Sequence, residues 1–238
     1  MTDLTTKTFE DAWQLAEGIK GWMTRGQAEM LWNAASALGP GQSILEIGSH
    51  CGRSTVILGT AAQNVGAKVT AVDPFVEGRL FGGPSTRSIF EGNIERAGLN
   101  DVVTLRAEYS TQLRPQWDEQ IDLLYIDGKH DYWTVTDDLR WAEHVPTGGN
   151  VLIHDCFSSI GVTSAILAHV APGHSLRYLD RSTSLARFEV GTPDAADRRR
   201  ILAQLPWWAR NVGIKVLLRA RLNGVAEKFG HTGTADPY

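Results

Sequence analysis

Two aspartates that each end a short apolar run are the residues of this chain best placed to do chemistry. Asp127 follows from the run I-D-L-L-Y-I, and Asp155 follows V-L-I-H. In a doubly wound sheet the two runs form neighbouring strands about 4.8 Å apart, so both carboxylates would lie at one edge. Carboxylates this close repel each other unless a cation lies between them, and oxygen ligands with room for water suit Mg²⁺. The pattern therefore predicts a magnesium site on Asp127 and Asp155; the alternative is that each aspartate caps the following helix.

The residues beside Asp155 offer no third ligand for this ion. Cys156 is unsuited because thiolates favour softer metals than Mg²⁺. His154 should point to the opposite face from Asp155, because successive side chains alternate along a strand. The third metal ligand is therefore left open.

A candidate general base lies close to the predicted metal. His130 follows Asp127 by three residues, and an imidazole there could take a proton from a hydroxyl held on the metal. Lys129 is the competing base, but it would need a lowered pKa to act at neutral pH. The alternative for His130 is a surface loop residue without a catalytic role.

A second site is indicated by residues 44–54, which read I-L-E-I-G-S-H-C-G-R-S. The apolar positions predict a buried strand, and Gly48 and Gly52 predict a turn into a helix where a ligand approaches the backbone. A dinucleotide turn carries three glycines and receives a pyrophosphate. Glu46 would repel a pyrophosphate and attract an ammonium or sulfonium group, so the pattern favours S-adenosylmethionine (SAM) over NAD. The alternative is a tight turn that binds no ligand.

Acidic and aromatic residues follow the next two predicted strands. Asp73 comes directly after the run 68–72, where a carboxylate can accept hydrogen bonds from ribose hydroxyls. An Asx turn before proline would explain this aspartate equally well. Glu108 and Tyr109 come shortly after the run 102–105, again at a carboxyl end, where ligand contacts concentrate in α/β sheets.

These residues must be positioned by a sheet whose strands alternate with helices. The alternation predicts an α/β fold with a doubly wound, Rossmann-like, seven-stranded and mostly parallel sheet, the last pair forming an antiparallel edge. The predicted strands are 44–47, 68–72, 102–105, 121–126, 151–153, 176–179 and 185–190, and the predicted helices are 9–38 with an interruption at Gly26, 54–62, 89–97, 134–143 and 161–170.

The chain divides into an N-terminal helical cap (1–40), a core (41–192) and a C-terminal helical extension (193–238), which together form one domain. Within the cap, residues 22–27 either have a purely structural role or fold over the ligand. Residues 75–88 are glycine-rich and long for a connection, which is typical of a lid or substrate loop.

The C-terminal extension differs in composition from the core. Trp207 and Trp208 follow a proline, and apolar and basic residues then alternate from 214 to 221. A basic amphipathic helix can lie on a membrane surface. The alternatives are a helix packed on its own domain, or on a second subunit in a homodimer.

Composition narrows the class of protein. The chain has 238 residues, of which 42% are hydrophobic, and a net charge of −4. This is enough for a full core, and it provides no basic field for nucleic acid. No run of about 18 apolar residues predicts a membrane span, and the first residues lack the layout of a signal peptide. Two cysteines make no disulfide framework, so we expect a reduced, cytoplasmic protein.

Taken together, these motifs resemble those of the class I SAM-dependent methyltransferases, and more closely those of the metal-dependent O-methyltransferases that act on catechols or on sugars. The likeness runs from about Trp22 to Phe188. It rests on the segments L-E-I-G-S-H-C-G-R-S, A-V-D-P, E-G-N-I-E-R-A-G-L, Y-I-D-G-K-H-D-Y and G-G-N-V-L-I-H-D.

The resemblance implies a role for each matching position. Asp127 and Asp155 match two of the family's three magnesium ligands, whereas Cys156 stands at the third position. His130 lies where the catechol branch carries its basic lysine. The implied cofactor contacts are Glu46, Gly48, Ser49, His50, Ser54, Asp73, Glu108, Tyr109 and Asp127.

The two departures from the family pattern, Cys156 and His130, make a sugar hydroxyl a better expected acceptor than a catechol. We therefore expect SAM-dependent methylation of a hydroxyl, with Mg²⁺ holding a small-molecule or saccharide acceptor and His130 removing its proton. General likeness points to the mycobacterial methylmannose-polysaccharide O-methyltransferases. The alternatives are a phenol O-methyltransferase, a nucleotide-dependent oxidoreductase and a non-catalytic SAM-binding protein.

Overall fold

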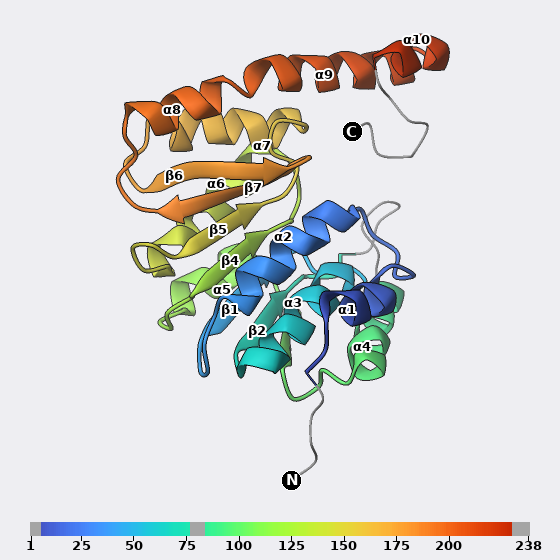
Figure 1. Ribbon diagram of the computed structural model, residues 1–238, viewed down its shortest axis with the longest axis vertical. Helices are drawn as coiled ribbons and strands as arrows, with labels where there is room; N and C mark the ends of the chain where they lie inside the picture. The colour runs from blue at the N-terminus through green and yellow to red at the C-terminus, as the bar shows by residue number, and fades with distance from the viewer. Residues whose placement is uncertain (1–5, 77–83, 230–238) are drawn as a thin grey trace.

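The computed structural model describes residues 6–76 and 84–229 (Figure 1). Its centre is one seven-stranded sheet with the strand order β3-β2-β1-β4-β5-β7-β6. Strands β1 to β5 are parallel, whereas β7 runs antiparallel to both β5 and β6. The predicted Rossmann-like sheet with an antiparallel edge is thus confirmed. The strands are β1 (Ser43–Ile47), β2 (Lys68–Val72), β3 (Val103–Arg106), β4 (Leu123–Ile126), β5 (Asn150–Ile153), β6 (Leu176–Ser182) and β7 (Leu185–Val190).

The register of the central strands decides which residues meet at the carboxyl edge. Ile47 of β1 pairs with Ile126 of β4, and Ile126 pairs with Ile153 of β5. The three strands therefore end at the same level. The strand order also reverses between β1 and β4, and the crevice outside such a switch point is where open α/β sheets bind ligands.

Side chains that alternate along the strands face two separate cores. Ile44 and Tyr125 face a core that α1 to α4 complete, whereas Leu45 and Ile126 face a core that α5 to α8 complete. The helices are α1 (Phe9–Ala16), α2 (Arg25–Ser36), α3 (Arg53–Val65), α4 (Pro84–Ala97), α5 (Ser110–Leu113), α6 (Tyr132–Asp138), α7 (Ile160–Ala165), α8 (Ala195–Leu202), α9 (Leu205–Arg219) and α10 (Asn223–Lys228).

The N-terminal cap differs from the single helix predicted over 9–38. It consists of two helices, and Gly26 lies inside the second helix instead of interrupting the first. The break comes earlier, because Thr24 and Gln27 form a capping box that starts α2. Residues 17–24 are therefore free to turn toward the carboxyl edge of the sheet.

Other helix boundaries also differ from the predictions. Helix α4 begins at Pro84, five residues before the predicted start at Ile89, and proline suits the first turn of a helix. The predicted lid loop 75–88 is thus partly helical, and its residues 77–83 lie outside the described part of the chain. The helices predicted over 134–143 and 161–170 end earlier as α-helix, and the chain continues as a 3₁₀ turn and a π turn.

The C-terminal helices form a rod along the β6 side of the sheet (Figure 1, orange to red). Asn211 Nδ2 of α9 donates to the carbonyl of Phe157 at 3.1 Å, and Lys215 Nζ donates to the carbonyl of Ser158 at 3.0 Å. Helix α9 therefore packs on its own domain and anchors the loop that follows β5. Within residues 6–76 and 84–229, no helix is both long and apolar enough to cross a bilayer.

Candidate active site at the carboxyl edge of the sheet

The turn after β1 touches the end of β4. Gly48 has φ +91°, and a Cβ atom there would lie 2.2 Å from the carbonyl oxygen of Asp127. Only glycine allows this backbone conformation and this approach. The two loops that the sequence assigned to the cofactor and to the metal are thus in direct backbone contact.

Glu46 has no exposed surface, and its carboxylate accepts hydrogen bonds from the hydroxyls of Ser54 and Thr55 at the start of α3. Burial raises its pKa to about 7, against the lowering effect of these hydroxyls. The carboxylate therefore ties the end of β1 to α3. The predicted contact between Glu46 and a cationic ligand remains a prediction.

Asp73 links the ends of β1 and β2. Its Oδ2 accepts a hydrogen bond from the His50 backbone N–H at 2.8 Å, and its Oδ1 accepts one from the Phe75 N–H at 2.7 Å. The ring of Trp22 lies 5.7 Å from the ring of His50, and Nδ1 of His50 is buried with no hydrogen-bond partner among the described residues. Residue Trp22 of the cap thus borders the predicted cofactor turn.

Glu108 and Tyr109 lie beyond β3. Glu108 forms an ion pair with Arg106 at 2.8 Å, and Tyr109 is half exposed before α5. The next residue, Ser110, donates to Oδ1 of the buried Asp138 at 2.6 Å. Asp138 and Ser110 were not among the predicted site residues, and no motif distinguishes them in the sequence.

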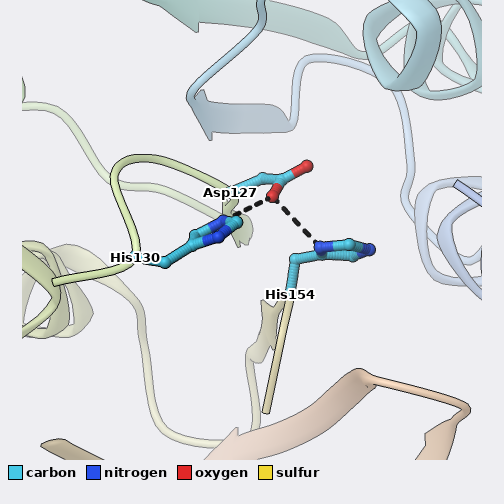
Figure 2. A group of neighbouring side chains, drawn as sticks. All are labelled: Asp127, His130 and His154. Carbon is cyan, nitrogen blue, oxygen red and sulfur yellow. Dashed lines mark ion pairs between the residues drawn. The ribbon is translucent and has the colours of Figure 1, made fainter. Parts of the chain in front are cut away.

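A cluster of charged side chains lies where β4 and β5 end, and we call Asp127, His130, His154 and Asp155 the strand-end cluster. The rings of His130 and His154 both point toward Asp127 (Figure 2). Asp127 Oδ1 lies 3.2 Å from His154 Nδ1 and 3.5 Å from His130 Nε2, and one ligand atom from each of these three residues fits within 4.8 Å of the others. Asp127 Oδ2 accepts a hydrogen bond from the hydroxyl of the buried Tyr125 at 2.9 Å.

Asp155 joins this cluster from the other side. Its Oδ2 lies 2.8 Å from His130 Nδ1, and its Oδ1 lies 3.7 Å from His154 Nδ1. The predicted pair of Asp127 and Asp155 is thus brought to one place, with two imidazoles between the carboxylates.

These carboxylates favour the charged form of both rings. Burial opposes a charge on His130, but its hydrogen bonds and attraction to Asp127 and Asp155 outweigh this effect and raise its pKa to about 10. Burial also opposes a charge on His154, while Asp127 and Asp155 raise its pKa to about 9. The two rings therefore neutralise the two carboxylates.

The prediction that His154 points to the opposite face from Asp155 is wrong, since its Nδ1 lies 3.7 Å from Asp155 Oδ1. Because Ile126 pairs with Ile153, the next residues on the two strands, Asp127 and His154, lie side by side on the same face. Asp155, one residue later, reaches the cluster only because its backbone turns to φ +58°. Aligning the apolar runs that end at Ile126 and Ile153 would have predicted that His154 lies beside Asp127.

The loop after β5 is held by its neighbours in a strained form. Asp155 and Phe157 both have φ +58°, which is unusual for a bulky residue such as Phe157. A Cβ atom built on Gly161 would lie 2.2 Å from the carbonyl oxygen of His130, so a side chain at this position would clash with that loop. Backbone strain of this kind clusters at functional sites.

The competing candidates lie outside the strand-end cluster. Lys129 is exposed and pairs with Asp131 at 3.1 Å, and Asp131 caps α6. Cys156 is fully buried, and burial raises the pKa of its thiol well above the usual value. A buried neutral thiol is a poor ligand for any cation.

The donor atoms of the strand-end cluster do not match the ion predicted from the sequence. Mg²⁺ prefers oxygen ligands and retained waters, whereas Asp127 shares its oxygen Oδ1 with two imidazole nitrogens. Both ring nitrogens of His154 are buried and lack a hydrogen-bond partner among the described residues. The residues present therefore fit a metal ion that takes both nitrogen and oxygen ligands better than they fit Mg²⁺.

Residues 45–156 match a family model that is described as a methyltransferase domain. The matched segment begins in β1 and ends directly after β5, so it contains the turn at Gly48 and the whole strand-end cluster. The strand-end cluster therefore lies entirely within the matched segment.

Several solved structures share the fold. Cofactor-bound Rv0187 from MTB is 17% identical with a TM-score of 0.60, covering 79% of this chain and 93% of that chain. The O-methyltransferase from Bacillus cereus in complex with SAH is 21% identical with a TM-score of 0.54, covering 80% and 94%. The O-methyltransferase TomG from Streptomyces achromogenes, involved in tomaymycin synthesis and solved in complex with SAM, is 15% identical with a TM-score of 0.54, covering 80% and 93%. The segment from β1 to β5 thus matches a methyltransferase domain model, and the chain shares its fold with these solved structures.

Proposed function

We propose that this chain is a SAM-dependent O-methyltransferase that methylates a hydroxyl of a small acceptor, with a sugar hydroxyl as the favoured class. The observation that carries the proposal is the His130–Asp155 contact of 2.8 Å beside Asp127. The contact orients His130 as a candidate base at the carboxyl edge of the sheet, and the turn at Gly48 lies at the same edge, against Asp127. A catechol or another phenol is the competing acceptor.

The cofactor would lie across the ends of β1 and β2. The backbone of the turn at Gly48 can approach a ligand closely, and each oxygen of Asp73 keeps a lone pair for a ribose hydroxyl beyond its contact to a backbone N–H. Glu108 and Tyr109, beyond β3, would border the adenine. His50 and Ser49 would line the same turn.

The reaction moves one methyl group. The acceptor oxygen forms a bond to the methyl carbon while the carbon–sulfur bond breaks, and the electron pair of that bond stays on sulfur. The hydroxyl proton would go to Nε2 of His130, while Asp155 accepts the Nδ1–H and fixes the orientation of the ring. Because Asp127 and Asp155 raise the pKa of His130, the neutral form that can accept this proton becomes more abundant as the pH rises. Much of the acceleration would come from holding the two reactants in line.

The test begins with the cofactor. Titration of the purified chain with SAM should give a heat signal, and titration with NAD should give none; no heat with SAM overturns the proposal. A screen with methyl-labelled SAM then offers sugars and catechols together, and preferential labelling of a sugar supports the favoured acceptor class. Binding of SAM without transfer to any acceptor would favour a non-catalytic SAM-binding protein.

A further inference from the structure

Asp138, at the end of α6, is a buried carboxyl group that lies outside the strand-end cluster. The residue is 1% exposed, and its Oδ1 accepts a hydrogen bond from the Ser110 hydroxyl at 2.6 Å. Its Oδ2 is buried and has no hydrogen-bond partner among the described residues. A buried polar atom without a partner costs free energy, so packing alone does not account for this side chain.

The surroundings of Asp138 favour its neutral form. Burial raises its pKa to about 7, and the acidic Asp137 and Asp131 act in the same direction, against the lowering effect of the hydrogen bond from Ser110. Ser110 on α5 and Gly128 in the loop after β4, which both lie close to the carboxyl group, carry no charge. Below neutral pH, Asp138 therefore acts as an uncharged hydrogen-bonding group.

Two segments at the carboxyl edge meet at this carboxyl group. Ser110 directly follows Tyr109 in the segment after β3. A Cβ atom built on Gly128 would lie 3.2 Å from Asp138 Oδ2, so the loop after β4 packs closely against the same carboxyl group. The backbone nitrogen of Gly128 in turn lies 2.7 Å from a Cβ atom built on Gly48. Asp138 thus links the segments after β3 and β4, and the second of these touches the turn after β1.

We propose that Asp138 positions the segments after β3 and β4 around the adenine of SAM, and that it acts through Ser110. The inference rests on the proposed function, in which Glu108 and Tyr109 border the adenine. The hydrogen bond holds Ser110 at the start of α5, and therefore also holds the backbone of Tyr109 directly before it. Asp138 is buried beneath these segments, so its role is that of a positioning residue.

Calorimetry with two ligands tests the adenine end of the site. SAM is compared with methylthioadenosine, which carries the adenosine of SAM without its methionine part, at about pH 6.5, where the carboxyl group is largely protonated. Asp138→Leu fills the space but removes the acceptor for Ser110. We expect it to weaken the binding of both ligands by the same factor, about tenfold, the usual size of one lost hydrogen bond. A loss confined to SAM would assign the effect to the methionine end and overturn the proposal.

Further variants show whether Asp138 acts through Ser110. Asp138→Asn keeps an oxygen that can accept from Ser110 and carries no charge, so it should retain the wild-type affinity for both ligands. Ser110→Ala should reproduce the loss seen in Asp138→Leu, and the double variant should lose no more than either single variant, because the two residues act as one unit. Additive losses, or a loss in Asp138→Asn as large as that in Asp138→Leu, contradict the proposal. Asp137→Asn, which removes the pair with Arg140, is the matched control and should bind both ligands normally.

Circular dichroism and thermal unfolding accompany each titration, so that a folding defect is recognised. If Asp138→Leu does not fold, Ser110→Ala decides the question, since normal affinity for both ligands in folded Ser110→Ala overturns the proposal. A wild-type chain that binds no SAM overturns the proposed function and this inference with it. SAM binding that is equally strong in the wild type, Asp138→Leu and Ser110→Ala overturns this inference alone.

Discussion

His130 and Asp155 make the shortest contact between charged side chains of the strand-end cluster, 2.8 Å from Nδ1 to Oδ2. The two residues come from the loops after β4 and β5, and Asp155 reaches His130 only through a left-handed backbone conformation. Nε2 of the same ring lies 3.5 Å from Asp127 Oδ1, so His130 bridges the two carboxylates. The orientation of the proposed base depends on this arrangement.

His130→Ala should depress turnover by about 10²–10⁴-fold, the usual contribution of a positioned general base. SAM affinity should stay unchanged, because the ring lies beyond the cofactor turn. Steady-state kinetics and calorimetry measure the two quantities. Lys129→Ala is the matched control and should change neither, since Lys129 is exposed and pairs with Asp131. Equal losses of turnover and SAM affinity in His130→Ala would assign His130 a structural role.

Gly48→Ala should destabilise the chain by about 2 kcal/mol or more, because a Cβ atom would meet the Asp127 backbone and φ is +91°. SAM affinity should fall as the turn moves. Urea denaturation and calorimetry check both effects. The control is Gly92→Ala in α4, where nothing lies within 4 Å; it should be neutral or stabilise by up to about 1 kcal/mol. Unchanged stability of Gly48→Ala would show that the two loops can separate freely.

Asp73→Asn should weaken SAM binding by roughly 10–100-fold, because a hydrogen bond to a charged group contributes about 1.5–3 kcal/mol. Calorimetric titration with SAM measures the change. Asp180→Asn, which alters only the exposed pair with Arg187, should leave the affinity unchanged. An Asp73→Asn variant that binds SAM normally but is less stable would favour the Asx-turn interpretation.

Asp138 should make stability depend on pH. Burial raises its pKa from 3.8 to about 7, although Ser110 donates a hydrogen bond that lowers it. The folded state therefore holds this proton more tightly than the unfolded state, and stability falls as pH rises from about 4 to about 7. Asp138→Asn should gain about 1–3 kcal/mol at pH 8 and little at pH 4.5, measured by urea denaturation. A gain of equal size at both pH values would refute this origin.

Asn211→Ala tests the anchoring of the loop after β5 by α9. The buried Asn211 donates to the carbonyl of Phe157, and an unpaired carbonyl should cost about 1–3 kcal/mol. Turnover should fall as well, because Phe157 and Asp155 share the loop. The exposed Arg219→Ala at the end of α9 should have no effect on thermal unfolding or turnover. Full activity in Asn211→Ala would limit the extension to a stabilising role.

Local pattern accounts for much of the fold. Runs of apolar residues predicted all seven strands, and β2 and β7 have the predicted boundaries. Helix boundaries were less accurate where capping decides them, as at Thr24, whose side chain starts α2 with Gln27. A capping box involves only a few residues, whereas apolar periodicity extends over the whole segment. The periodic pattern alone therefore predicted one helix where the structure has two.

The sequence by itself determined the sheet, the turn at Gly48 and the placement of Asp127, His130 and Asp155 at the carboxyl edge, because each depends on short-range pattern and chain order. Only the tertiary structure decided that His154 faces Asp127, that Glu46 is buried against α3, and that α9 anchors the loop after β5. These relations depend on strand register and on contacts between distant segments. A shift of one residue in register moves a side chain to the other face of the sheet, and the sequence of one strand does not specify it.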